Sequence, residues 1–171
     1  AGEEGTLVKT VVNAKSIEQR KRLNAASRLV QKGDLLGAVV FMRQLQADMP
    51  ESIEVFTKLG EMYLQTGQYS RLIADLETLN PIMRESPQIQ WLEARLKLIQ
   101  EKPEEALAML EGLKGMSEDS TYLSLLAATY QQLSKHEQAL EIYWALLQGN
   151  PRNGQWWAGL SISCLLYTSD A

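Results

Sequence analysis

The sequence predicts an all-α protein, an α-solenoid of stacked antiparallel helical hairpins, and three observations lead to this fold. The 171 residues include only 11 glycines and 5 prolines, too few for a chain of strands separated by turns. Apolar residues recur at the three- and four-residue spacing of one-sided helices. The sequence also repeats itself with a period of about 34 residues, which is typical of stacked helical units.

Four series of residues share this period. The small residues step by 34, 34, 33 and 34, and three further series take the same first three steps, including the loss of one residue in the third unit. The small residues are Ala26, Gly60, Ala94, Ala127 and Ser161, and the other series are Leu45, Leu79, Leu113 and Leu146, then Met42, Leu76, Leu110 and Tyr143, then Ala38, Leu72, Ala106 and Ala139. One shared period predicts four complete repeats and the start of a fifth.

Each repeat reads as two short helices. In the second repeat the apolar spacing predicts helices over 56–64 and 72–79, with Gly67 where the first one stops. In the fourth repeat it predicts helices over 123–130 and 139–146. The small residues allow the two helices of a hairpin to approach, because a larger side chain would hold them apart.

These features resemble the tetratricopeptide repeat (TPR), which has this period, a small residue in the first helix, Ala in the second and a terminal Pro. The matching residues are Gly60, Tyr63, Ala106, Ala139, Pro50 and Pro151. The resemblance implies a TPR-type α-solenoid over residues 16–163. Leu72 replaces the usual Ala, and Glu93 and Lys97 stand at usually apolar positions, so the second and third repeats are expected to be the least regular.

Two terminal segments are expected to lie outside this repeat domain. Residues 1–15 read as a linker or disordered lead-in. Residues 164–171 read CLLYTSDA, which the transposase adapter of a sequencing library would encode. We therefore expect an adapter-derived tail on a metagenomic fragment of bacterial origin, with the natural chain breaking off near Ser163. A natural frayed helix is the alternative.

Composition predicts no enzyme activity, no cofactor and no metal. The chain has one His and one Cys, which excludes a metal site built from those residues. The net charge of −4 argues against a nucleic-acid partner or direct contact with an anionic membrane. The basic residues between Lys15 and Lys32 are expected to be a solvated helix face, with an anion-binding patch as the alternative.

Residues that could suggest catalysis have structural explanations. We expect His136 to be exposed in a turn between helices. The pairs Glu104–Glu105 and Glu118–Asp119 are expected at helix starts, where negative charge meets the positive end of the helix dipole. The sequence contains no phosphate-binding, dinucleotide-binding or serine-nucleophile motif.

The predicted binding site is the concave groove that the first helices line in TPR proteins, with a protein or peptide as partner. Trp91 and Arg95, one helical turn apart, are residue types enriched at binding hot spots. Leu64 and Leu98 would supply an apolar floor. The alternative is that Trp91 packs between neighbouring first helices. The groove-facing positions are Leu23, Ser27, Val30, Thr57, Glu61, Leu64, Trp91, Arg95, Leu98, Ser124, Ala128 and Gln131.

A narrower resemblance covers residues 122–163. This stretch is similar to the periplasmic repeats of MshN-type biogenesis proteins of the mannose-sensitive haemagglutinin type IV pilus. The shared features are Tyr122-Leu123, Tyr130-Gln131-Gln132-Leu133, Trp156-Trp157 and Gly159-Leu160. The resemblance implies a scaffold for pilus assembly in the periplasm, as a domain of a protein anchored in the inner membrane.

Three alternatives stay open. The chain could be the regulatory TPR region of a larger enzyme, such as a glycosyltransferase, whose catalytic residues lie elsewhere. It could also be a chaperone-type adaptor, although that would need Lys or Asn where Leu23, Ser27 and Gln88 stand. A cytoplasmic location is the alternative to the periplasm. The oligomeric state is not predicted.

Overall fold

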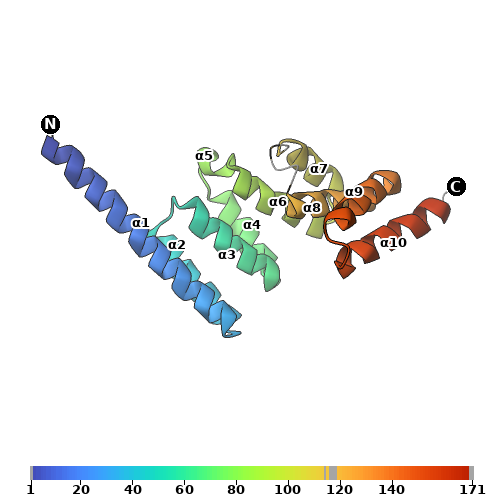
Figure 1. Cartoon of the computed structure of the whole chain (residues 1–171). Helices are drawn as coiled ribbons and strands as arrows, with labels where there is room; N and C mark the ends of the chain where they lie inside the picture. The colour runs from blue at the N-terminus through green and yellow to red at the C-terminus, as the bar shows by residue number, and fades with distance from the viewer. Residues whose placement is uncertain (1, 114, 116–118, 170–171) are drawn as a thin grey trace. The chain divides into compact units, whose positions relative to one another are not determined.

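The computed structural model describes residues 2–113, 115 and 119–169, with side chains from residue 5 onward. All of the regular secondary structure in these ranges is helical (Figure 1). The helices are α1 (Gly2–Gln31), α2 (Leu35–Asp48), α3 (Ile53–Gln65), α4 (Tyr69–Glu77), α5 (Pro81–Arg84), α6 (Pro87–Ile99), α7 (Pro103–Glu111), α8 (Ser120–Gln132), α9 (His136–Gly149) and α10 (Gly154–Ser169). Each described helix is too short or too polar to span a bilayer.

The predicted solenoid of helical hairpins is confirmed. The hairpins are α1–α2, α3–α4, α6–α7 and α8–α9, and α10 is the first helix of a fifth repeat. The short α5 lies between the second and third hairpins along the chain, where the sequence has two prolines. The chain divides into two compact units, Ala1–Arg84 and Glu85–Ala171.

Local sequence explains where the helices begin. Side chains at the N-caps accept hydrogen bonds from backbone N–H groups that would otherwise lack partners. Asp34 caps α2 through Gly37 N (2.9 Å), Ser52 caps α3 through Val55 N (3.3 Å), and Asp119 caps α8 through Thr121 N (2.7 Å). Helices α6 and α7 each begin at a proline, whose fixed φ suits the first helical position.

The turn inside each hairpin contains one residue with a left-handed backbone. These residues are Gly33 (φ 82°), Gly67 (φ 70°), Glu101 (φ 57°) and Ser134 (φ 58°), and they follow the repeat period. Glycine adopts this conformation without steric cost, whereas Glu101 and Ser134 carry a Cβ that the conformation crowds. The first two turns are therefore relaxed, and the other two are strained.

The small residues of the repeat lie at the helix crossings, as predicted. Ala26, Gly60, Ala94 and Ala127 on the first helices are buried. Their counterparts Ala38, Ala106 and Ala139 on the second helices are also buried, as is Leu72, which replaces Ala in the second repeat. Such residues let the helix axes come close, which is the packing that the period requires.

The N-terminal segment differs from its prediction. Residues 2–15 are the first half of α1 rather than a linker, and residues 6–31 contain neither glycine nor proline to stop the helix. At 1.5 Å per residue the 30 residues of α1 span about 45 Å, and the 14 of α2 about 21 Å. Helix α1 therefore extends well past α2 (Figure 1). Residues 5–18 are exposed, and burial begins at Gln19.

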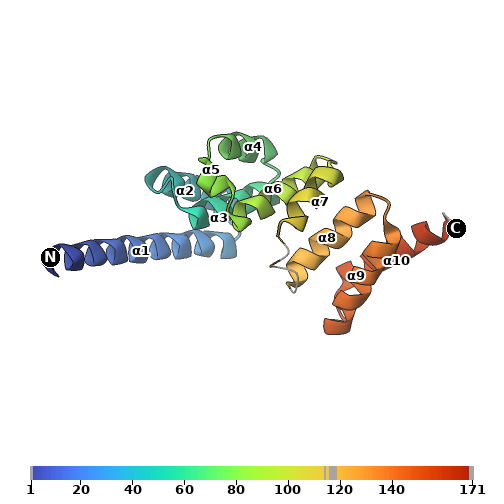
Figure 2. The same ribbon diagram turned by 90° about the horizontal axis from the view of Figure 1, so that it is seen from above.

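The second unit contains the third and fourth hairpins and α10. Helices α8, α9 and α10 lie alongside one another (Figure 2). The predicted tail is helical where it is described, since residues 164–169 belong to α10, while residues 170–171 and Glu118 lie outside the described part of the chain.

Candidate functional site

Trp91, the centre of the predicted groove, has a packing role. It lies on α6, is half-buried, and packs against the core cluster formed by Ala94, Leu110, Leu113 and Tyr122. Its ring centroid lies 6.5 Å from that of Tyr122 on α8, with the ring planes tilted by 32°. This is a favourable aromatic pair between neighbouring first helices. Trp91 therefore packs between neighbouring first helices, as the alternative interpretation had it, although part of its side chain stays accessible.

The predicted apolar floor is closed to solvent. Leu64 and Leu98 are only 8% and 7% exposed, so neither offers much surface to a ligand. The positions one turn before them, Glu61 and Arg95, are half-exposed, and each already interacts within the chain. The sequence analysis placed all of these positions on one helix face, but it missed that Leu64 and Leu98 are buried.

The fourth-repeat positions bind the fifth repeat rather than open space. Gln131 Nε2 donates hydrogen bonds to Gly159 O (2.8 Å) and Ser163 Oγ (2.7 Å), and Gln131 Oε1 accepts one from the Tyr143 hydroxyl (3.1 Å). Trp156 Nε1 donates to Ser124 Oγ (2.8 Å). Ser124 and Gln131 therefore position α10, which the sequence reasoning missed.

This network has a buried aromatic residue at its centre. Burial raises the pKa of Tyr143. A Cβ added to Gly159 would overlap the Tyr143 ring, so the glycine makes room for the phenol. Ala128, also on α8, is half-buried. The signal in the sequence was Gly159 itself, a glycine inside a helical segment, which can mark a close packing contact.

In the first unit the predicted groove positions differ widely in exposure. Leu23 is buried against α2, Ser27 and Thr57 are half-buried, and Val30 is 37% exposed. The two hydroxyl groups bond within their own helices, Ser27 Oγ to Leu23 O (3.1 Å) and Thr57 Oγ1 to Ile53 O (2.7 Å). These positions therefore offer a mixed surface and no convergent set of polar groups.

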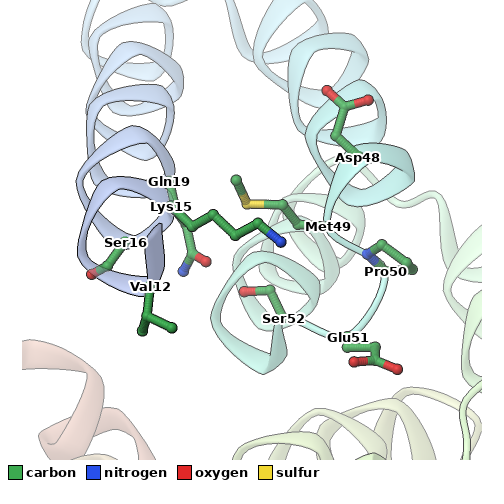
Figure 3. A pocket seen from close by; sticks show the side chains of 9 residues that line it. All are labelled: Val12, Lys15, Ser16, Gln19, Asp48, Met49, Pro50, Glu51 and Ser52. Atoms are coloured by element: carbon green, nitrogen blue, oxygen red, sulfur yellow. The ribbon is translucent and has the colours of Figure 1, made fainter. Parts of the chain in front are cut away.

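A pocket of about 510 Å³ lies elsewhere in this unit, between α1 and the connection from α2 to α3 (Figure 3). Its lining residues are Val12, Lys15, Ser16, Gln19, Asp48, Met49, Pro50, Glu51 and Ser52. Figure 3 shows Lys15 extending from α1 towards that connection. The pocket mixes aliphatic surface with opposite charges, which suits the end of a peptide or helix.

Two contacts fix the walls of this pocket. Arg22 Nη2 lies 2.7 Å from Asp48 Oδ2, and this hydrogen bond lowers the pKa of the Asp48 carboxyl. Gln19 Nε2 donates to Glu54 Oε2 (2.9 Å), joining α1 to α3. Hydrogen bonds and an ion pair therefore hold the α2 side of the pocket in place. The basic residues of α1 did not predict this pocket in the sequence, because its shape depends on where α2 ends.

A second pocket of about 410 Å³ lies in the second unit. It is lined by Ser120 and Leu123 of α8, by the end of α9, and by Trp156 of α10. The residues from α9 and the following turn are Ala145, Leu146, Gly149 and Asn150. Its walls are small and largely apolar, and none of its lining side chains is ionisable.

The residues that could suggest catalysis have structural environments. His136 is 7% exposed as the first residue of α9, so the expectation of an exposed turn residue is wrong, and its Nδ1 has no hydrogen-bond partner. Asp119 caps α8, and Glu104 and Glu105 lie in the first turn of α7, as predicted. Glu105 pairs with Lys97, whose hydrogen bond lowers the pKa of the Glu105 carboxyl.

Lys97 also stands where the repeat usually has an apolar residue. Its ammonium group pairs with Glu105 on α7, so an ion pair within the third hairpin compensates for the charged residue at this position. Within the described ranges, no group of three or more His, Cys, Asp or Glu side chains is arranged to hold a metal ion.

Solved structures with similar folds were found by structural comparison. A crystal structure of MamA protein matches with a TM-score of 0.65 and 16% identity, over 88% of this chain and 82% of that chain. Residues 41 to the end of MamA from Desulfovibrio magneticus RS-1 match with a TM-score of 0.64 and 14% identity, over 88% and 92%. A tetratricopeptide repeat protein from Parabacteroides merdae matches with a TM-score of 0.64 and 18% identity, over 88% and 60%.

These likenesses establish the TPR-type fold. At such low identities they say nothing about which residues bind what. No protein-family model and no curated protein matches the chain. The narrower resemblance to MshN-type pilus proteins receives no support from these comparisons.

Proposed function

We propose that this chain is a non-enzymatic scaffold that binds a peptide or helix of a partner protein on the surface of its first helices. The fold carries the proposal, because stacked hairpins within a unit present a surface made of the first helix of each repeat. Recognition by such surfaces relies on side-chain anchors rather than on a deep cavity. Of the acidic residues that resemble catalytic pairs, Asp119 caps α8 and Glu105 pairs with Lys97.

The binding residue we favour is Trp91, with Arg95 one turn further along α6. Both side chains are half-exposed, so each can serve the fold and still contact a partner. Tryptophan and arginine are enriched at hot spots because they combine large apolar area with directional polar groups. The expected ligand therefore has an apolar anchor and a nearby acidic residue.

The test compares two tryptophans in the second unit. Peptides would be selected from a displayed random library on the folded chain, and their affinity measured by calorimetry. Trp91→Ala should weaken binding by about 2 kcal/mol or more. Trp144→Ala, which removes a 56% exposed tryptophan on α9, should leave affinity unchanged. Arg95→Ala should weaken binding less, and its effect should shrink at high salt.

The packing of Trp91 against Tyr122 makes stability an essential control. Thermal unfolding of Trp91→Ala should show a folded chain at the temperature of the binding measurement. Equal losses of affinity from Trp91→Ala and Trp144→Ala would contradict the site. Selected peptides that bind the second helices rather than α6 would contradict it as well.

As a finer proposal, the partner is a component of a type IV pilus assembly machine, and the chain works in the periplasm. Support comes from the resemblance of residues 122–163 to MshN-type proteins alone. The flanking gene sequence tests it: an upstream apolar span and neighbouring pilus genes are expected. A nucleotide-sugar transferase domain in the same gene would instead make the chain the regulatory region of an enzyme.

A further inference from the structure

The N-terminal half of α1 carries an apolar face that nothing in its own unit covers. Leu7, Val8, Val11 and Val12 are 66%, 62%, 52% and 62% exposed. A helical segment of about 14 residues, such as the exposed half of α1, is marginal in water on its own, and tertiary packing of one apolar face normally stabilises it. An uncovered face on a projecting helix therefore indicates a missing partner.

This face is a direct continuation of the one that packs on α2. Successive residues along it are spaced by four, three, four, four and three positions, the pattern of a single helix face. They are Val8, Val12, Lys15, Gln19, Leu23 and Ala26, and burial sets in from Gln19 onward, where α2 begins to cover the helix. A second helix can thus extend the existing α1–α2 packing.

The sequence of this segment is complementary to itself in the antiparallel direction. Three pairs of positions are symmetric about the peptide bond between Lys9 and Thr10. They are Val8 with Val11, Leu7 with Val12, and Glu4 with Lys15. Two copies aligned antiparallel would therefore bring apolar residues together at the centre and opposite charges together at each end.

The pocket beside α1 lies where the end of such a partner helix would arrive. It opens next to Lys15 and Ser16, and Glu51 lies on its opposite wall. In the antiparallel register, the first residues of the second copy reach this point, because position 4 of that copy is aligned with Lys15. The positive end of the incoming helix dipole then lies near the carboxylate of Glu51.

We propose that the N-terminal half of α1 is a self-association surface, on which a second copy of this chain docks its own α1 antiparallel. The interface is small, at the low end of specific interfaces, so the dimer is expected to dissociate in the micromolar range or above, on the order of 10 μM. This surface is separate from the Trp91 surface, and the two proposals fail independently.

A second exposed apolar surface, on α10, lacks charges that would set the register of a helix pair. Helix α10 exposes Trp157, Ile162 and Leu165, but residues 154–169 contain no charged side chain. Charges at the flanks of a helix pair set its register and orientation. The face of α10 has nothing to set them, whereas the sequence of α1 has Glu4 and Lys15 at opposite ends of its stripe.

The first test measures mass against concentration by sedimentation equilibrium of the full chain. Val11→Glu should raise the dimer dissociation constant at least about tenfold, because it places two charges in the apolar centre. Glutamate is a better helix former than valine, so this change does not weaken the helix intrinsically. Val40→Glu, at a 70% exposed valine on α2, is the matched control and should leave association unchanged.

A crosslinking test fixes the direction of the two helices. In a Cys164→Ser background, mixing copies carrying Glu4→Cys with copies carrying Lys15→Cys should give disulfide-linked dimers, because like positions then lie about 11 residues, or about 16 Å, apart along the antiparallel pair. Either variant alone should crosslink far less, since the antiparallel register places unlike positions opposite each other. Efficient crosslinking of each variant with itself would show a parallel pair and overturn the proposal.

A charge exchange tests the register. Lys15→Glu should weaken the dimer, and combining it with Glu4→Lys should restore the association. A chain that stays monomeric up to the highest soluble concentration would overturn the proposal. So would a dimer that Leu165→Glu on α10 abolishes while Val11→Glu does not.

Discussion

Helices α8 and α10 occupy the same place in consecutive repeats, but only α8 has a second helix packed on its other side. Toward the preceding hairpin the two helices are alike, because Thr129 and its counterpart Ser163 are both fully buried. On the opposite face they differ. Ala127 is buried against α9, whereas its counterpart Ser161 is exposed.

The comparison separates two roles of a first helix in this solenoid. One face seats the helix on the repeat before it, and the other receives the second helix of its own hairpin. The seating face of α10, which includes Gly159 and Ser163, is fully packed against the fourth repeat. Gln131 contributes hydrogen bonds to it, and Tyr143 contributes a ring contact. Its other face shows what the equivalent face of α8 would expose if α9 were removed.

The largest effect is expected when the same large side chain is placed at the two equivalent positions. Ala127→Leu should destabilise the chain by about 2–3 kcal/mol, because the α8–α9 crossing has no space for three more carbon atoms. Ser161→Leu should change the free energy of unfolding by less than about 0.5 kcal/mol, since its site faces solvent. Urea unfolding measures both. Equal effects at the two positions would show that the two faces are not distinct.

An intermediate effect is expected on the seating face of α10. Gly159→Ala should lower the free energy of unfolding by about 1–2 kcal/mol. The new methyl group overlaps the Tyr143 ring, and the energy of this clash exceeds the gain in helix propensity from glycine to alanine. Gly154→Ala, where an added Cβ meets nothing within 4 Å, is the control and should be neutral or stabilising. A neutral Gly159→Ala would mean that α10 is not seated against Tyr143.

The smallest effect concerns the phenol of Tyr143. Tyr143→Phe removes the hydrogen bond to Gln131 and should cost about 1 kcal/mol at neutral pH. Burial raises the pKa of Tyr143 in the folded state, so its contribution is present below about pH 10 and is lost as the pH rises through the folded value. The difference between wild type and variant should therefore narrow above about pH 10. A difference that stays constant in alkaline unfolding experiments would exclude this coupling.

The hairpins could be predicted because their signals are local and periodic. The alanines at the crossings, the turn residues and the capping residues each act within one repeat, so a single sequence reveals them. The helix over residues 2–15 could not, because Gly2 and Gly5 resemble a linker and the valines that follow have modest helix propensity. That its apolar stripe is exposed becomes clear only once the end of α2 is known.

The site was less predictable because it depends on contacts between repeats. Trp91 meets Tyr122, and Gln131 meets Gly159 and Ser163, across distances of about one repeat in sequence. Which first-helix positions face a neighbour and which face solvent is set by the rotation from one repeat to the next. The period gives the equivalence of positions, but it does not give that rotation.

The left-handed residues in the hairpin turns bear on the order in which the chain folds. A non-glycine residue in this conformation costs about 1–2 kcal/mol, and this energy opposes the step in which the turn closes. The turns at Gly33 and Gly67 close without it, whereas those at Glu101 and Ser134 do not. Repeat arrays can nucleate at any repeat, so folding is expected to start in the first two hairpins and spread toward α10. Pulse-labelled hydrogen exchange would then show protection in α2 and α3 before α8 and α9, and Ser134→Gly would shorten the delay.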